Sequence, residues 1–428
     1  MKLDALRARY LAVFYICILS LGTGCSVKKL FEQVKTSPSI TGFENFIALY
    51  PKSKFADSAS IALEKLYEDR DWKTAQSYNT IYRYKEFALK YPHGDHVKEA
   101  RTIISQKEQQ QNPYFKQDDY AKNVPPEYEA GVKELVNYLM IPAMNDLEKV
   151  RLIYSWIAYH IKYDADAYNT GHYGDLTPEG VLKSKISVCF GYSSLFQAMA
   201  VTAGLEGRQI SGFAKGYGYQ TGRGFPKEPN HAWNAVKING VWKLFDVTWG
   251  SGYGQDQNGA LVSYARFDDY WFDTDPAEFI FNHYPENTDN QFIIPKIDLL
   301  QFQALPNIHG SFFTLGFSGD SALVLIRNNH IKEFADPYSI DQKVKIISTP
   351  YPKNLNSNEL IEFVIATEYA GDISVINNAE WTHFEQNGST FSLRIKPRAG
   401  KLSLAAKFDP RTKTYETFLQ YNIIANEE

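Results

Sequence analysis

Cysteine is scarce in this chain, which contains three cysteines in 428 residues. Cys17 and Cys25 lie near the start of the chain, so Cys189 is the only thiol in the rest of it. A single thiol cannot form an intrachain disulfide, which excludes the disulfide-stabilised scaffolds that many small secreted domains use. The presence of Cys189 therefore needs another explanation.

An excess of charge of one sign is also absent, because 45 Lys and Arg residues stand against 49 Asp and Glu residues. Nucleic-acid-binding domains usually carry a basic excess, so we expect no nucleic-acid partner. No phosphate-binding glycine loop and no metal-ligand spacing occur, and the nine histidines are scattered, with no cysteine or carboxylate cluster near any of them. We therefore expect no cofactor and no bound metal.

The apolar run near the N-terminus, YLAVFYICILSLG, is too short to span a bilayer. Basic residues precede it and LGTGC follows, which is the order of an export signal. LGTGC resembles a bacterial lipobox, in which cleavage leaves a cysteine that receives lipid, although Gly22 stands where leucine is usual. We expect residues 1–25 to be a signal peptide and the protein to be exported to the bacterial cell envelope, with a membrane anchor on Cys25. The alternative is an ordinary secretory signal in which Cys25 has no role.

Two similar segments follow a short tether at 26–39: FIALYPKSKFADSA at 46–59 and FALKYPHGDHVKEA at 87–100. Their apolar residues have helical spacing, and the proline of each Tyr-Pro pair ends a helix. We predict helical hairpins over 40–110 that resemble tetratricopeptide repeats, but are too few for a free-standing solenoid. They either dock an envelope protein partner or form an appendage that packs on the next domain or spaces it from the membrane.

The remaining chain divides by composition into a polar, proline-containing linker at 111–131, a core domain at 132–294 and a strand-rich part at 295–428. Short runs such as FFTLGF, SALVLIRN and LIEFVIATEY, separated by turn signals, predict a C-terminal antiparallel β-sandwich. The expected fold class is α+β. Trp381 and Phe384 would allow glycan binding if they were exposed on this sandwich, but a sandwich core explains them equally well.

Cys189 precedes apolar residues at 195–200 that have helical spacing, so we place it at or just before a helix N-terminus. The helix dipole favours a thiolate there, and a thiolate attacks carbonyl groups. Gly191 leaves room beside the sulfur. Taken alone, Cys189 is better explained as a small buried apolar residue.

The segment NHAWNAVKINGVWKLFDVTWG predicts a β-hairpin, because the Asn-Gly pair at 239–240 favours a two-residue type I′ turn. That turn fixes the register and places His231 opposite Thr248. Asp246 then points to the same face as His231, as its diagonal neighbour. A carboxylate can hold one imidazole nitrogen and leave the other to take a proton from a thiol, so Cys189, His231 and Asp246 are candidate catalytic residues.

Five stretches resemble the transglutaminase-like superfamily, a branch of the papain-like fold, and within it the group related to kyphoscoliosis peptidase. They are YSWIAYHIKYD, VCFGYSSLFQAMAVTAGL, ISGFAKGYGYQTG, NHAWNAVKINGVWKLFDVTWGSG and YWFDTDPAEFIFNHYP, within a similarity that covers about 145–317. The resemblance implies a nucleophile at Cys189, a base at His231 and an orienting acid at Asp246. Ser187 departs from the family, which commonly has glycine there, and its Cβ would narrow the approach to the sulfur.

The resemblance implies cysteine-dependent acyl transfer or hydrolysis on peptide or protein amides, resolved by water in a peptidase or by an amine in a transglutaminase. The alternative is a catalytically weak or inactive envelope lipoprotein that acts as a protein-binding scaffold. The expected partner is a peptide or protein substrate. The candidate substrate-binding residues are Tyr163, Asp164, Gly191, Tyr192, Trp233 and Trp249.

Overall fold

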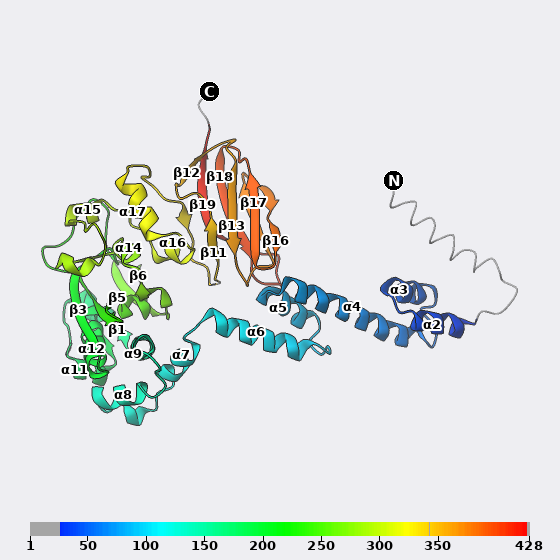
Figure 1. Cartoon of the computed structure of the whole chain (residues 1–428), viewed down its shortest axis with the longest axis horizontal. Helices are drawn as coiled ribbons and strands as arrows, with labels where there is room; N and C mark the ends of the chain where they lie inside the picture. The colour runs from blue at the N-terminus through cyan, green and yellow to red at the C-terminus, as the bar shows by residue number, and fades with distance from the viewer. Residues whose placement is uncertain (1–25, 342, 426–428) are drawn as a thin grey trace. The chain divides into compact units, whose positions relative to one another are not determined.

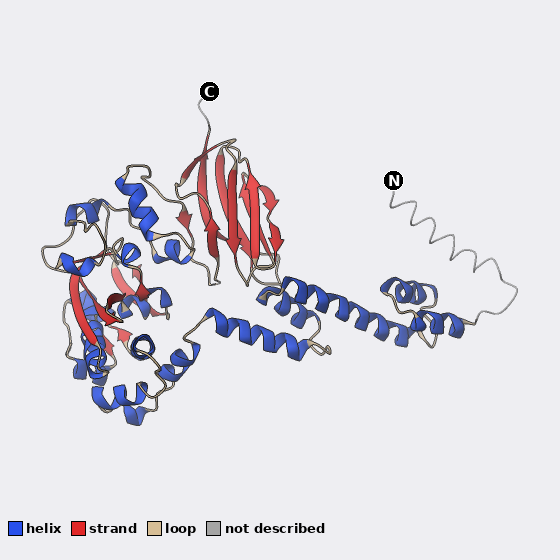
Figure 2. Ribbon diagram, in the orientation of Figure 1, coloured by secondary structure: helices blue, strands red, loops and turns tan. Residues whose placement is uncertain are grey.

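The computed structural model describes residues 26–341 and 343–425 (Figure 1). The expected signal peptide at 1–25, with Cys25, lies outside the described residues. Within the described ranges, none of the helices combines the length and the apolar character that a membrane span requires. The chain divides into two units, one ending at Ile103 and the other beginning at Ile104, and each is described by itself. Helices dominate the first part of the sequence and strands the last part (Figure 2).

The first unit is helical, and both repeated segments contribute a helix that ends just before their Tyr-Pro pair. The segment at 26–39, expected as a tether, instead contains helix α2. Ser26 caps this helix by accepting a hydrogen bond from the Lys29 backbone N–H, and Phe31 packs in a small core with Phe43 and Phe46. The helices are α2 (Val27–Thr36), α3 (Ile40–Leu49), α4 (Ala56–Tyr78), α5 (Ile81–Lys90) and α6 (Val97–Gln111), whose end extends into the second unit.

The second unit begins with helices in the segment that was expected to be a linker. Asp118 of α7 (Phe115–Lys122) accepts hydrogen bonds from Nε and an Nη of Arg151 at 2.7 and 2.8 Å, and from the Ser155 hydroxyl at 2.6 Å. Arg151 and Ser155 lie on α9 (Asp146–His160), and all three side chains are buried. This ion pair holds the linker segment against the core domain. Between these helices lie η1 (Pro126–Tyr128) and α8 (Val132–Leu139).

The centre of this unit is a five-stranded antiparallel sheet in the order β8-β5-β4-β3-β9. Helix α12 (Cys189–Thr202) packs on β3 and β4 and buries its apolar side chains against the sheet. The strands are β3 (Glu206–Ala214), β4 (His231–Ile238), β5 (Val241–Phe245), β8 (Phe272–Thr274) and β9 (His283–Pro285).

The hairpin between β4 and β5 has the predicted turn, since Asn239 and Gly240 both have positive φ and Ile238 pairs with Val241. The ladder ends earlier than expected, at the pair Asn234 and Phe245. The expected pairing of His231 with Thr248 is wrong, because the chain leaves the sheet after β5 and turns into helix α13 (Val247–Gly250). His231 pairs instead with Gly212 of β3.

Short elements connect the strands and helices of this unit. Strand β1 (Lys162–Tyr163) pairs in parallel with β2 (Ile186–Ser187), so that Tyr163 lies opposite Ser187, two residues before Cys189. The other elements are α10 (Ala165–Thr170), α11 (Pro178–Ser184), the hairpin of β6 (Gly252–Gln257) and β7 (Ala260–Ala265), η2 (Asp269–Trp271), α14 (Pro276–Phe279) and η3 (Thr288–Gln291).

Two runs expected as strands, FFTLGF and SALVLIRN, are helical instead. They lie in α16 (Gly310–Thr314) and α17 (Gly319–Arg327), after α15 (Leu299–Ala304). Ser318 caps α17 by accepting a hydrogen bond from the Ser321 N–H, and the buried residues Gly319, Ala322 and Leu323 lie on one helical face. A short apolar run does not by itself distinguish a buried helix from a strand. At 319–327 the Ser318 cap favours the helix.

The remaining strands form two sheets that share an apolar core. One has the order β10-β19-β18-β14-β15 with β12 parallel to β19, and the other has the order β11-β13-β17-β16. The structure is thus α+β, as predicted. Trp381 is 48% exposed, whereas Phe384 is buried in the sandwich core. The strands are β10 (Asp336–Pro337), β11 (Lys345–Ser348), β12 (Asn354–Asn356), β13 (Ile361–Ala366), β14 (Asp372–Asn377), β15 (Glu380–His383), β16 (Glu385–Asn387), β17 (Thr390–Ile395), β18 (Gly400–Lys407) and β19 (Glu416–Ile424).

Replacing Asp118 by alanine should destabilise the second unit by about 3–5 kcal/mol, because Arg151 would keep a buried charge without its partner. The measurement is urea unfolding followed by tryptophan fluorescence. Asp146→Ala is the matched control, since it removes a solvent-accessible pair with Lys149 and should cost less than about 1 kcal/mol. Equal unfolding midpoints for the two variants would contradict this account of the α7–α9 contact.

Candidate active site

Cys189 is the first residue of α12, and the extended residue Val188 forms its N-cap without a side-chain hydrogen bond. The backbone N–H groups of Gly191 and Tyr192 both donate to the Val188 carbonyl, which closes the first turn. Cys189 is 8% exposed and lines a cleft of about 1100 Å³. A helix N-terminus favours negative charge, so the location suits a thiolate.

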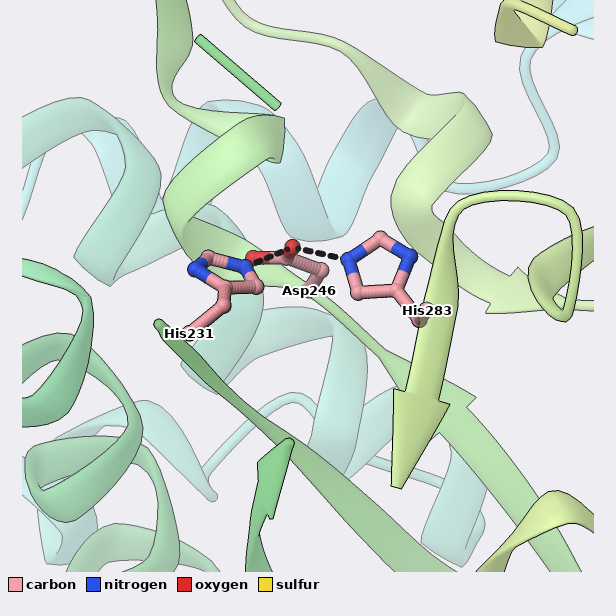
Figure 3. A group of neighbouring side chains, drawn as sticks. All are labelled: His231, Asp246 and His283. Atoms are coloured by element: carbon pink, nitrogen blue, oxygen red, sulfur yellow. Dashed lines mark hydrogen bonds and ion pairs between the residues drawn. The ribbon is translucent and has the colours of Figure 1, made fainter. Parts of the chain in front are cut away.

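His231 begins β4 and lines the same cleft as Cys189. Its Nε2 lies 2.7 Å from Oδ2 of Asp246, which leaves Nδ1 on the opposite side of the ring (Figure 3). Burial alone would lower the pKa of His231, but the charge and hydrogen bond of Asp246 and the side chain of Cys189 raise that pKa to about 10. His231 is therefore an imidazolium at neutral pH, with Nδ1 left for Cys189.

Asp246 is fully buried at the junction between β5 and α13. Its Oδ1 accepts a hydrogen bond from the Trp249 N–H at 3.1 Å, and its Oδ2 accepts two from histidine rings. Burial would raise the pKa of the Asp246 carboxyl, but the charge of His231 and the hydrogen bonds from both histidines hold that pKa well below its usual range. The carboxylate is therefore ionised.

The second histidine is His283 of β9, whose Nε2 lies 2.9 Å from the same Oδ2 (Figure 3). Burial lowers the pKa of His283 to about 4. The sequence predicted one histidine, His231, beside Asp246, and the contact of His283 with the same carboxylate was not predicted. The FNHYP stretch gave no sign of this contact, because β9 is three residues long and pairs with β3, which lies far earlier in the sequence.

His231, Asp246 and His283 are also a possible metal-ligating group, with one donor atom from each lying within 4.8 Å of the others. In the structure, both imidazole Nε2 atoms are hydrogen bonded to one carboxylate oxygen. A metal held by these residues would have to replace both hydrogen bonds. The observed arrangement is thus that of an oriented carboxylate.

The candidate substrate-binding residues separate into two groups. Tyr163 and Trp249 line the cleft. Burial, and after it the electrostatic interaction with Cys189, raise the pKa values of the Tyr163 and Tyr168 phenols, which places both rings near the sulfur. Lining aromatic side chains give the cleft a largely apolar wall, and these are Tyr163, Tyr168, Tyr173, Phe190, Tyr217, Tyr219, Trp249, Tyr253 and Trp271.

The other four candidates make internal contacts. Asp164 caps α10 through a hydrogen bond from the Ala167 N–H, and Tyr192 is buried and donates to the Ile161 carbonyl at 2.7 Å. Trp233 is buried and packs against the rings of Phe279 and His283. Gly191 is required for close packing, since a Cβ there would lie 2.0 Å from the Ser187 hydroxyl oxygen.

Ser187 does not narrow the approach to Cys189, which was the expected effect of its Cβ. It is buried beside Gly191, and the described residues that line the cleft do not include it. Its hydroxyl makes no hydrogen bond to any part of the chain that the structure describes. The serine at position 187, where the family commonly has glycine, therefore packs against Gly191 and not in the cleft.

Residues 133–247 match the family model of the transglutaminase-like superfamily. Human kyphoscoliosis peptidase is 39% identical over 190 residues, which cover 44% of this chain and 28% of that protein. Hillarin of Drosophila melanogaster is 31% identical over 210 residues, covering 46% of this chain and 25% of its own length. A crystal structure of a TGase aligns with 38% of this chain and 44% of its own, at 22% identity and a TM-score of 0.23. The chain thus spans about a quarter of the length of these two curated relatives.

The two histidines on Asp246 should titrate far apart. We expect NMR of histidine labelled with ¹³C and ¹⁵N to show His231 charged and His283 neutral throughout pH 5–9, with pKa values of about 10 and about 4. Loss of each signal in His231→Ala and His283→Gln assigns the resonances. Titration of His231 near the ordinary value of 6.5 would contradict the described electrostatics.

Proposed function

We propose, from the premise that residues 133–247 form a domain of the transglutaminase-like superfamily, that this protein is a cysteine-dependent acyl-transfer enzyme that acts on peptide or protein amides. The proposal rests on the arrangement of three side chains. Cys189, at a helix N-terminus, and His231 line one cleft, and Oδ2 of the buried Asp246 lies 2.7 Å from Nε2 of His231. A cysteine, a base and an orienting acid are the groups this chemistry needs.

In the proposed reaction, the Cys189 thiolate attacks the carbonyl carbon of the amide and forms a C–S bond. The backbone N–H of Cys189 donates a hydrogen bond to the oxyanion. The His231 imidazolium then gives its Nδ1 proton to the amine as the C–N bond breaks, which leaves an acyl-enzyme. Water or a primary amine attacks that thioester, passes a proton to His231 and releases the thiolate.

Asp246 stays ionised through these steps. It accepts the Nε2–H of His231, which fixes the ring orientation and stabilises the imidazolium.

The reaction product distinguishes the two kinds of enzyme. A peptidase uses water and releases an acid, whereas a transglutaminase uses an added primary amine and releases an amide.

The reactivity of the thiol tests this proposal. Alkylation of Cys189 by iodoacetamide should remain fast at pH 6, because the charged His231 stabilises the thiolate. In His231→Ala the thiol should regain an ordinary pH dependence, and its rate at pH 6 should fall at least about tenfold. Peptide mass spectrometry of the alkylated chain measures the rate at Cys189.

His172→Ala, at an exposed position, is the control and should leave the profile unchanged. A wild-type rate that rises with pH like that of an ordinary thiol, and does not depend on His231, would refute the enzymatic proposal. The protein-binding scaffold would then be the better account.

We further propose that the protein is exported and anchored to the cell envelope through lipid on Cys25, so that its substrates or partners are envelope proteins. The support is the basic start, the apolar run and the LGTGC sequence. In a bacterial host, an alkyne fatty acid should label the wild-type protein and Cys17→Ser but not Cys25→Ser. Equal labelling of both variants would contradict the lipid anchor.

A further inference from the structure

We infer that His283 is a positioning residue for the catalytic carboxylate: its Nε2, 2.9 Å from Oδ2, fixes Asp246 in the orientation that holds His231. This inference rests on the proposed function, because it assigns a task within the same Cys189–His231–Asp246 site. His283 touches neither the cleft nor Cys189 in the described contacts, and it acts through Asp246.

The sheet topology explains how a histidine on β9, two strands away from His231, reaches the carboxylate. Strand β3 lies between β4 and β9, with Gly212 opposite His231 and Ala214 opposite His283. Residues two apart on a strand point to one face, so both imidazoles and both small residues share the face that carries Asp246. Gly212 and Ala214 leave the space above β3 open, and His283 reaches across it to Asp246.

Gly212 has a further role in this arrangement. A Cβ at this position would lie 2.5 Å from the ring of Trp233 and 2.3 Å from the Tyr284 carbonyl oxygen. The missing side chain lets β9 approach β3 closely, and this approach brings His283 into range of Asp246.

Aromatic packing keeps His283 uncharged. Its ring stacks on Phe279 with a centroid separation of 4.0 Å, and the rings of Trp249, Trp233 and Trp271 lie 4.5, 5.1 and 5.3 Å away. Asp246 and His231 are the charged groups near the ring. Burial among apolar rings disfavours an imidazolium, and the positive charge of His231 disfavours it further.

A neutral imidazole carries one proton, and two acceptors compete for it. Asp246 lies at Nε2, and the Phe279 carbonyl lies near Nδ1, which makes no hydrogen bond of good geometry within the described chain. A carboxylate is the stronger acceptor, so the proton resides on Nε2 and is donated to Asp246.

This neutral donor has a specific consequence for catalysis. Asp246 has three N–H donors, from His231, His283 and Trp249, and a buried carboxylate that loses one of them becomes harder to keep ionised and in place. A second cation at His283 would instead compete with His231 for the negative charge. The neutral donor orients Asp246 and leaves its charge to His231.

The test compares two substitutions of His283. His283→Phe keeps an aromatic ring and removes the donor, whereas His283→Gln supplies an N–H that can replace Nε2–H. We expect alkylation of Cys189 at pH 6 to fall about tenfold in His283→Phe and to recover at least half of the wild-type rate in His283→Gln. The pKa of His231, measured by NMR, should fall by about one unit in His283→Phe alone.

A folded His283→Phe protein with an unchanged His231 pKa and an unchanged alkylation profile would overturn the inference, even if its thermal stability dropped. The ¹⁵N shifts of the wild-type His283 ring provide a test that needs no variant: they should show a proton on Nε2 and none on Nδ1, and the reverse tautomer would also overturn the inference. A wild-type thiol that reacts without dependence on His231 would refute the proposed function, whereas the His231 pKa and the ring tautomer would still test the role of His283.

Discussion

The buried negative charge of Asp246 governs the arrangement of the elements around it. A carboxylate out of contact with water is costly unless hydrogen-bond donors surround it. Here the donors come from β4, β9 and the first turn of α13, so three separate segments must converge on one side chain. The short helix α13 contributes to this convergence, because it takes the chain out of the sheet directly after Asp246 and presents the Trp249 N–H to Oδ1.

Two histidines that contact one oxygen atom are held in opposite charge states by their surroundings. His231 borders the cleft and interacts with Cys189, and the attraction of the carboxylate outweighs the cost of burial. His283 is enclosed by Phe279 and three tryptophan rings, and the cost of burial outweighs the attraction of the carboxylate. In many active sites, the surroundings push the pKa values of two neighbouring groups apart, so that one group is charged and the other is neutral at the same pH.

Local sequence signals predicted those parts of the site that local rules determine. The helix that starts at Cys189 and the turn at Asn239 and Gly240 follow from apolar spacing and turn chemistry, and both are observed. His283 was missed because its partner strand is distant in sequence, and the helices at 310–327 were mistaken for strands because short apolar runs suit either state. The contact between His231 and Asp246 was predicted correctly but for the wrong reason. The prediction extended the β4–β5 pairing to these residues, whereas the ladder ends at Asn234 and Phe245 and Asp246 is instead the N-cap of α13.

The raised pKa of His231 also bears on how the domain withstands extremes of pH. In the unfolded chain this ring titrates near 6.5, whereas in the folded chain its pKa is about 10. The ion pair with Asp246 therefore supports folding fully below about pH 6.5, and that support declines as the pH rises through about 10. The depressed pKa of Asp246 likewise supports folding above the ordinary carboxyl pKa near 3.8, and that support declines as the pH falls below this value. The buried, neutral His283 acts in the opposite direction to His231, because its pKa of about 4 lies below the ordinary value near 6.5 and its contribution to folding is lost as the pH falls between those values. The combined support that the two rings give to the folded domain is therefore greatest near pH 6.5.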